Sequence, residues 1–142
     1  MTEQKIKYKE LTKPRWWAWD RKYELLEDYT YYFDESIVKT GISLYHTSAE
    51  TVFVYIDKTR IICKKGFVFG PSGPTFDTQS FMRGACVHDA IYWFIRNEFL
   101  SVSWKAIGDL ILKELCVEDG MSKFRANYIY LAVKVFGWYS LQ

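Results

Sequence analysis

Cysteine is scarce in this 142-residue chain, which contains only Cys63, Cys86 and Cys116. An odd number of cysteines with no CxxC or Cys/His ligand spacing argues against a disulfide framework and a structural zinc site. We therefore predict that all three are reduced, buried thiols that pack as small apolar side chains.

Long hydrophobic runs are also missing. No stretch reaches the roughly 18 consecutive apolar residues of a membrane-spanning helix, and residues 1–13 lack the apolar run of a signal peptide. These absences predict a soluble protein with no transmembrane span and no signal peptide.

The chain also lacks an excess of either positive or negative charge. The formal net charge is +2 with acids and bases mixed along the chain, so no basic cluster indicates a nucleic-acid partner. Aromatic residues, by contrast, make up 19% of the chain. Those that remain at the surface can meet a lipid, a base or another protein.

The length predicts one domain, residues 1–142, with one core. Residues 1–65 are rich in strand signals, residues 66–77 form a Gly/Pro loop, residues 78–137 form three helices and residues 138–142 form a tail. The expected fold class is α+β, with an N-terminal antiparallel β-sheet of hairpins followed by a three-helix C-terminal half.

Strand-forming residues concentrate in residues 22–33, 51–56 and 60–64. The polar residues 57–59 permit a reversal, which predicts a β-hairpin between the last two segments. Alternation predicts that one face of the hairpin's first strand is formed by Val52, Val54 and Ile56 and the other by Phe53 and Tyr55.

Three helices are predicted from apolar spacing and from residues that begin and end helices. Their expected boundary residues are Asp77 or Thr78 and Asn97, then Ser103 and Asp119–Gly120, then Ser122 and Gly137. Their expected inward residues are Phe81, Ala85, Ile91 and Ile95, then Ile107, Leu110, Ile111 and Leu115, then Arg125, Ile129, Ala132, Val133 and Phe136. Gly84 is expected to permit close packing of the first helix.

A polar cluster interrupts the apolar pattern of the first helix. His88 and Tyr92 are four residues apart and share a face, while Asp89 points about 100° away. Asp109 comes 21 residues after His88, which lets the next helix return antiparallel and bring the two side chains together. A carboxylate that orients an imidazole lets it take a proton from water, so we predict a catalytic centre of His88, Asp109 and Tyr92.

Asp89 remains free for another role. A carboxylate beside a glycine-rich loop with exposed carbonyls offers the oxygen ligands that Ca²⁺ prefers. The candidate metal ligands are Asp89, Gly70 and Gly73, and no other cofactor is expected.

Each candidate also has a structural interpretation. The His-Tyr pair can be a hydrogen-bonded part of the core, and Asp109 can favour the dipole of its helix. Asp89 can pair with Arg96 or Lys105 at the surface. The glycine-rich segment can be a simple turn, and without a following lysine it is a poor phosphate-binding loop.

Four segments resemble a family of small bacteriophage and bacterial proteins known only as a domain of unknown function. They are GFVFGPSGPTFDTQSFMRGACVHDAIY at 66–92, GD at 108–109, EDGMS at 118–122 and AVKVFG at 132–137. The resemblance implies a phage or prophage origin, located in the host cytoplasm or the virion, and no particular activity. Family members usually carry an acid where this chain has Phe69, so a site that needs this acid would be altered here.

A more distant resemblance is to secreted phospholipase A(2), including its short prokaryotic and parvoviral forms. It rests on a glycine-rich loop, then His-Asp with Tyr four residues after the His, then an Asp on the next helix. It implies that His88 is the general base, Asp109 its orienting partner, Tyr92 a support, and Asp89 a Ca²⁺ ligand beside carbonyls near Gly70 and Gly73. The chain lacks the paired cysteines that brace most secreted members.

Two functions follow as hypotheses. The first is a hydrolase with a His/Asp centre, with Ca²⁺ as a candidate cofactor, that acts on a lipid or other small ester; Trp16, Trp17 and Trp19 among basic residues would suit a lipid interface. The second is a non-enzymatic phage accessory or virion protein that binds a phage structural protein or forms a homo-oligomer. An intracellular inhibitor of a host component is a third idea with no distinguishing mark in the sequence.

Overall fold

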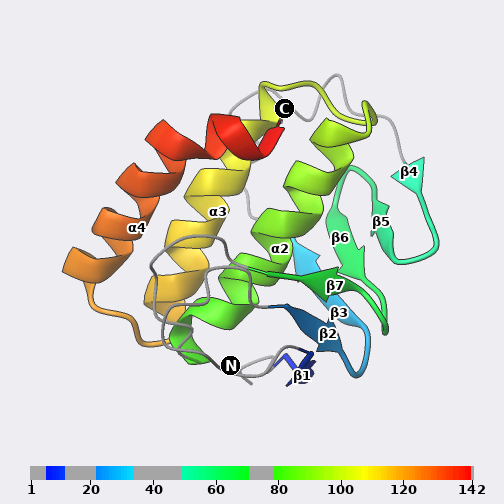
Figure 1. Cartoon of the computed structure of the whole chain (residues 1–142), viewed down its shortest axis with the longest axis horizontal. Helices are drawn as coiled ribbons and strands as arrows, with labels where there is room; N and C mark the ends of the chain where they lie inside the picture. The colour runs from blue at the N-terminus through cyan, green and yellow to red at the C-terminus, as the bar shows by residue number, and fades with distance from the viewer. Residues whose placement is uncertain (1–5, 12–21, 34–48, 71–78, 142) are drawn as a thin grey trace.

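Residues 6–11, 22–33, 49–70 and 79–141 are described by the computed structural model, in which the strands precede the helices (Figure 1). Within these residues, seven strands form two antiparallel sheets and three α-helices occupy the C-terminal half. The predicted α+β class is confirmed.

The two sheets have the strand orders β1-β2-β7 and β3-β6-β5-β4. The strands are β1 (Tyr8–Glu10), β2 (Tyr23–Leu25), β3 (Tyr29–Tyr32), β4 (Ala49–Glu50), β5 (Val54–Ile56), β6 (Arg60–Cys63) and β7 (Val68–Phe69). Side chains alternate between buried and half-buried along β2, β5 and β6, which is typical of strands with one face on a core.

The β5–β6 hairpin confirms the predicted reversal. Its register places Ile56 opposite Ile61, and both side chains are fully buried. In the turn, Asp57 Oδ1 accepts hydrogen bonds from the backbone N–H groups of Thr59 at 2.8 Å and Arg60 at 3.0 Å. The carboxylate therefore satisfies the turn's backbone, as aspartate commonly does.

The structure differs from the strand predictions in three details. Residues 22–33 form strands as predicted, but β2 and β3 belong to two different sheets because the chain turns between them. Val52 is 78% exposed and does not share the buried face of Val54 and Ile56, because hydrogen bonds between Thr51 and Val54 form a turn before β5 begins. The predicted loop contains a strand at Val68–Phe69, because this segment pairs with β2.

The three predicted helices are confirmed as α2 (Gln79–Arg96), α3 (Trp104–Glu118) and α4 (Lys123–Phe136). Ser122 begins α4 as predicted, because its Oγ accepts a hydrogen bond from the backbone N–H of Arg125 at 3.2 Å. Gly120 follows α3 with φ +99°, a conformation that favours glycine. The predicted caps at residues 77 and 78 lie outside the described residues.

The core lies around α2, which is placed between α3 and the strands (Figure 1). The predicted inward residues of α2 and α3 are buried, except Leu110, which is half-buried. A Cβ on Gly84 would lie 3.0 Å from the carbonyl oxygen of Leu112, so this glycine lets α2 and α3 approach closely. The three cysteines are buried and free, as predicted.

The predicted inward face of α4 is only partly correct. Ala126 and Ile129 are the buried residues of this helix, whereas Arg125 is half-buried and Phe136 is 65% exposed. The reason is that α4 contacts α3 on one side and lies at the outer edge of the molecule (Figure 1). The chain then forms the 3-10 helix η2 (Gly137–Leu141), which contacts α2.

Within the described ranges, none of the helices is both long and apolar enough to cross a bilayer.

Candidate functional site

The close packing of α2 and α3 brings His88 and Asp109 together. His88 Nε2 lies 2.8 Å from Asp109 Oδ1. Beside Asp109, a Cβ on Gly108 would lie 3.1 Å from Cγ2 of Ile91, which is about one helical turn after His88. Glycine at position 108 therefore lets α2 and α3 approach closely. The two helices therefore make the contact that the 21-residue separation predicts.

Asp109 accepts hydrogen bonds from two further side chains. The hydroxyl of Tyr92 donates to Oδ1 at 2.6 Å, and Lys105 Nζ donates to Oδ2 at 2.7 Å. The Asp109 side chain is 2% exposed, so the carboxylate exchanges water for these donors almost completely. The rings of His88 and Tyr92 also contact each other, with centroids 4.0 Å apart.

The donors keep Asp109 ionised despite its burial. Burial alone would raise the pKa of Asp109, but hydrogen bonds from His88, Lys105 and Tyr92, together with the His88 charge, hold this pKa below its ordinary value. Burial, and then the hydrogen bond to Asp109, raise the pKa of Tyr92 well above its usual range. At neutral pH, Asp109 is therefore a carboxylate and Tyr92 a hydroxyl donor.

Lys105 connects this centre to the end of α4, and sequence analysis missed its role. Its Nζ donates to the backbone carbonyl of Val133 at 3.1 Å and to that of Lys134 at 3.2 Å, in the last turn of α4. It also lies 4.9 Å from the centre of the Trp138 ring. The signal that could have found it is the four-residue spacing from Lys105 to Asp109 on one helix.

The second ring nitrogen of His88, Nδ1, is the atom of this centre that the described residues leave without a partner. Nδ1 makes no hydrogen bond to any of the described residues. The His88 side chain is 10% exposed. Asp109 is an acceptor only, so Nε2 carries the hydrogen of the neutral ring and Nδ1 presents a lone pair.

Asp89 lies beside the centre and binds the preceding loop. Its Oδ2 accepts a hydrogen bond from the backbone N–H of Gly70 at 2.8 Å. Burial raises the pKa of Asp89, although the Gly70 hydrogen bond and the charges of His88, Arg96 and Lys22 oppose this rise. The suggested surface pairing of Asp89 with Lys105 is wrong, because Lys105 pairs with Asp109.

The predicted metal ligands are only partly described. Asp89 and Gly70 lie together, but Gly73 falls outside the described residues. Asp89 Oδ1 accepts no hydrogen bond from the described residues and is an oxygen that a cation could use. Ca²⁺ takes about six to eight oxygens, and no group of three or more His, Cys, Asp or Glu that could hold a metal ion occurs among the described residues. The described part of the chain thus supplies one carboxylate of such a site.

A second buried charge, Arg83 on α2, was not predicted. Its Nε and Nη2 contact the two carboxylate oxygens of Asp119 at 3.0 and 2.8 Å, and its Nη1 donates to the hydroxyl of Tyr29 at 3.3 Å. This bidentate pair links β3 and α2 to the end of α3. Each of the three guanidinium nitrogens has a protein partner, which is typical of a structural link.

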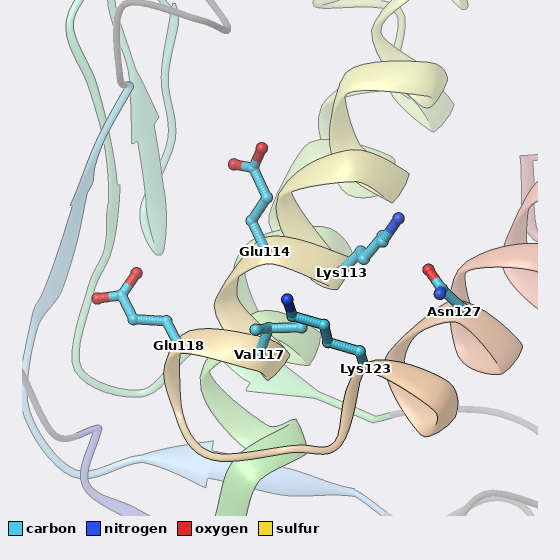
Figure 2. Close-up of a pocket in the computed structure, with 6 residues that line it drawn as sticks. All are labelled: Lys113, Glu114, Val117, Glu118, Lys123 and Asn127. Carbon is cyan, nitrogen blue, oxygen red and sulfur yellow. The ribbon is translucent and has the colours of Figure 1, made fainter.

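A cavity of about 440 Å³ lies between α3 and α4 (Figure 2). It is lined by Lys113, Glu114, Val117, Glu118, Lys123 and Asn127. The carboxylates of Glu114 and Glu118 point away from the amine of Lys113, so the lining does not aim its polar groups at one point (Figure 2). The cavity contains none of the residues around Asp109 and is not part of the candidate site.

Comparisons with protein-family models, with curated proteins and with solved structures find no match to this chain.

Proposed function

We propose that the chain is a hydrolase in which His88 is the general base, acting on an ester such as a phospholipid. The observation that carries this proposal is the hydrogen bond between Nε2 and Asp109, which leaves Nδ1 as the basic nitrogen. Activation of water by an oriented imidazole is the chemistry that this arrangement supports best.

The proposed step is the attack of water on the ester carbonyl. His88 Nδ1 takes one proton of the water as its oxygen bonds to the carbonyl carbon. The imidazolium then gives this proton to the alcohol oxygen as the ester C–O bond breaks, which leaves the acid and the free alcohol. Asp109 stabilises the imidazolium, and Tyr92 holds the carboxylate through its 2.6 Å hydrogen bond. Lys105 donates a hydrogen bond to the other oxygen of the same carboxylate, so its positive charge offsets part of the negative charge beside His88.

Ca²⁺ is the cofactor that this proposal includes. Held by Asp89 and by loop carbonyls near Gly70 and Gly73, it would polarise the ester carbonyl. Asp89 supports this because one of its oxygens is not used by the described residues.

The test compares the wild-type chain with His88→Gln on phosphatidylglycerol vesicles and on a soluble ester, with Ca²⁺ or with EGTA. The glutamine side chain of this variant keeps an N–H donor near the place of Nε2 but cannot take a proton, so we expect activity to fall by about 10²- to 10⁴-fold. Circular dichroism and thermal unfolding serve as the fold control. Wild-type protein with no hydrolysis above buffer, or a variant as active as wild type, would refute the hydrolase.

A second candidate function is a non-enzymatic phage accessory or virion protein. It is favoured by the burial of Asp109, whose three donors would also suit a structural link between α2, α3 and the end of α4. In this case His88→Ala lowers the free energy of unfolding by about 1–3 kcal/mol, no ester is hydrolysed, and the protein co-purifies with phage particles. Its absence from particles would count against this candidate.

A further inference from the structure

The outward side of α4 and η2 concentrates exposed apolar residues. Of the fifteen large hydrophobic residues exposed in the described chain, seven lie within residues 124–139, whereas the other eight come from several separate strands and loops. The seven are Phe124, Tyr128, Leu131, Val135, Phe136, Trp138 and Tyr139, which are 50–85% exposed. We call these seven residues the α4 stripe.

Four residues of the α4 stripe share one face of α4. Phe124, Tyr128, Leu131 and Val135 follow one another at intervals of four, three and four residues. The opposite side of α4 packs on α3 through apolar residues. A helix that is apolar on both sides is typical of a buried position, so the stripe predicts a second partner for α4.

The area of the α4 stripe matches one side of a stable interface. Its five aromatic residues alone expose roughly 700 Å², if each side chain brings about 200 Å². The largest apolar patch of a typical monomer is about 300–600 Å². Each partner of a standard interface buries about 800 Å², which the stripe reaches once Leu131 and Val135 are included.

The charges around the stripe are few and lie at its borders. Residues 123–141 contain three basic residues, Lys123, Arg125 and Lys134, and no Asp or Glu. A core of Phe, Tyr and Trp with charges at the edge is typical of protein interfaces. Three basic residues are fewer than the roughly four to eight that mark an anionic-lipid site.

We propose that the α4 stripe is the contact surface of a homodimer, where it packs against the same stripe of a second copy about a two-fold axis. A continuous helical row of side chains can interdigitate with an identical row, so the surface complements itself. This inference is independent of the proposed hydrolase, because mass is measured without a substrate.

Sedimentation velocity of the full chain, from low to high micromolar concentration, tests the dimer. We expect a species of twice the 16.9 kDa chain mass. Leu131→Glu, near the middle of the stripe, should raise the dimer Kd by at least about a hundredfold. The interface would then bury two unpaired carboxylates, one from each copy. The matched control Val52→Glu places the same charge on a residue outside the stripe that is 78% exposed, and should leave the dimer intact.

A second measurement uses Leu131→Cys and a short bismaleimide cross-linker. The three native cysteines are buried, so the introduced thiol is the reactive one, and a covalent dimer is expected. Three results would overturn the proposal: a monomer at every concentration, a dimer that Leu131→Glu leaves unchanged, and a monomer that binds phosphatidylglycerol vesicles through the stripe.

Discussion

Asp109 is a buried acid that joins α2 to α3. Three donors reach its carboxylate, His88 and Tyr92 from α2 and Lys105 from α3. A buried charge is tolerated when it is both paired and hydrogen-bonded, and here each carboxylate oxygen has at least one donor. The cost of removing Asp109 comes mainly from the lysine that is then left buried without its counterion.

Asp109→Ala should lower the free energy of unfolding by about 3–5 kcal/mol, because Lys105 loses its buried partner. Urea unfolding at neutral pH measures this loss. The control is Glu27→Ala, whose ion pair with Lys7 spans 3.7 Å between side chains that are both more than half exposed. The control should cost less than about 1 kcal/mol, and an equal effect of the two variants would contradict the assigned role of Asp109.

The lowered pKa of Asp109 also predicts how stability depends on pH. A carboxyl whose pKa is lower in the folded chain stabilises fully above its unfolded pKa of about 4. This contribution is lost as the pH falls through the folded pKa, where the group becomes protonated. Acid titrations of urea stability should therefore be flatter for Asp109→Asn than for wild type below about pH 4, and parallel curves would argue against an ionised Asp109.

At the scale of elements, the α2–α3 pair positions the candidate site. His88 and Asp109 meet because small residues, Gly84 and Gly108, let the two helices approach. Lys105 then joins the end of α4 to this pair through two backbone carbonyls. The distance between α2 and α3 therefore controls the hydrogen bond between His88 and Asp109.

Gly84→Ala should separate α2 from α3, because the new Cβ would lie 3.0 Å from both the carbonyl oxygen and Cδ1 of Leu112. Helix propensity favours alanine, but overpacking against backbone costs about 1–3 kcal/mol. Thermal unfolding should show the loss, and ester hydrolysis, if present, should fall with it. Ala106→Gly is the control on an exposed position of α3, where only propensity changes and hydrolysis should persist. A Gly84→Ala variant that is more stable than wild type would show that the contact between α2 and α3 has room for a methyl group, and would contradict this prediction.

At the scale of the whole molecule, the core encloses all three cysteines. Burial raises the pKa of Cys116 to about 12, against partial lowering by Arg125 and Arg83. Burial also raises the pKa of Cys86 well above its usual value. Thiolate is the reactive form, so both enclosure and a raised pKa protect Cys86 and Cys116 in the folded chain.

Labelling with a thiol reagent such as Ellman's at pH 8 should therefore be slow in the native protein and should reach three thiols per chain in denaturant. The labelling rate should rise with urea as the folded fraction falls, because the three cysteines lie on β6, α2 and α3 and need the core to open. Rapid labelling of one thiol without denaturant would show that part of the core opens independently.

Local signals in the sequence were enough for the three helices, for the β5–β6 hairpin and for one central pair of residues. Ser122 and Gly120 mark helix ends through their own backbone and side-chain bonding, and Asp57 marks the hairpin turn in the same way. The approach of His88 to Asp109 also followed from sequence, because two helices joined by a short connection pack antiparallel and the spacing then sets which turns meet.

Tertiary packing, by contrast, determines which surfaces are covered and which donors reach a buried acid. Arg83 finds Asp119 36 residues away, and Lys105 joins Asp109 to carbonyls of α4. The exposure of Phe136 likewise depends on α4 lying at the outer edge of the molecule. These contacts join residues that are far apart in the chain, and each residue has several suitable partners. Which partner it contacts is determined only when the whole core packs.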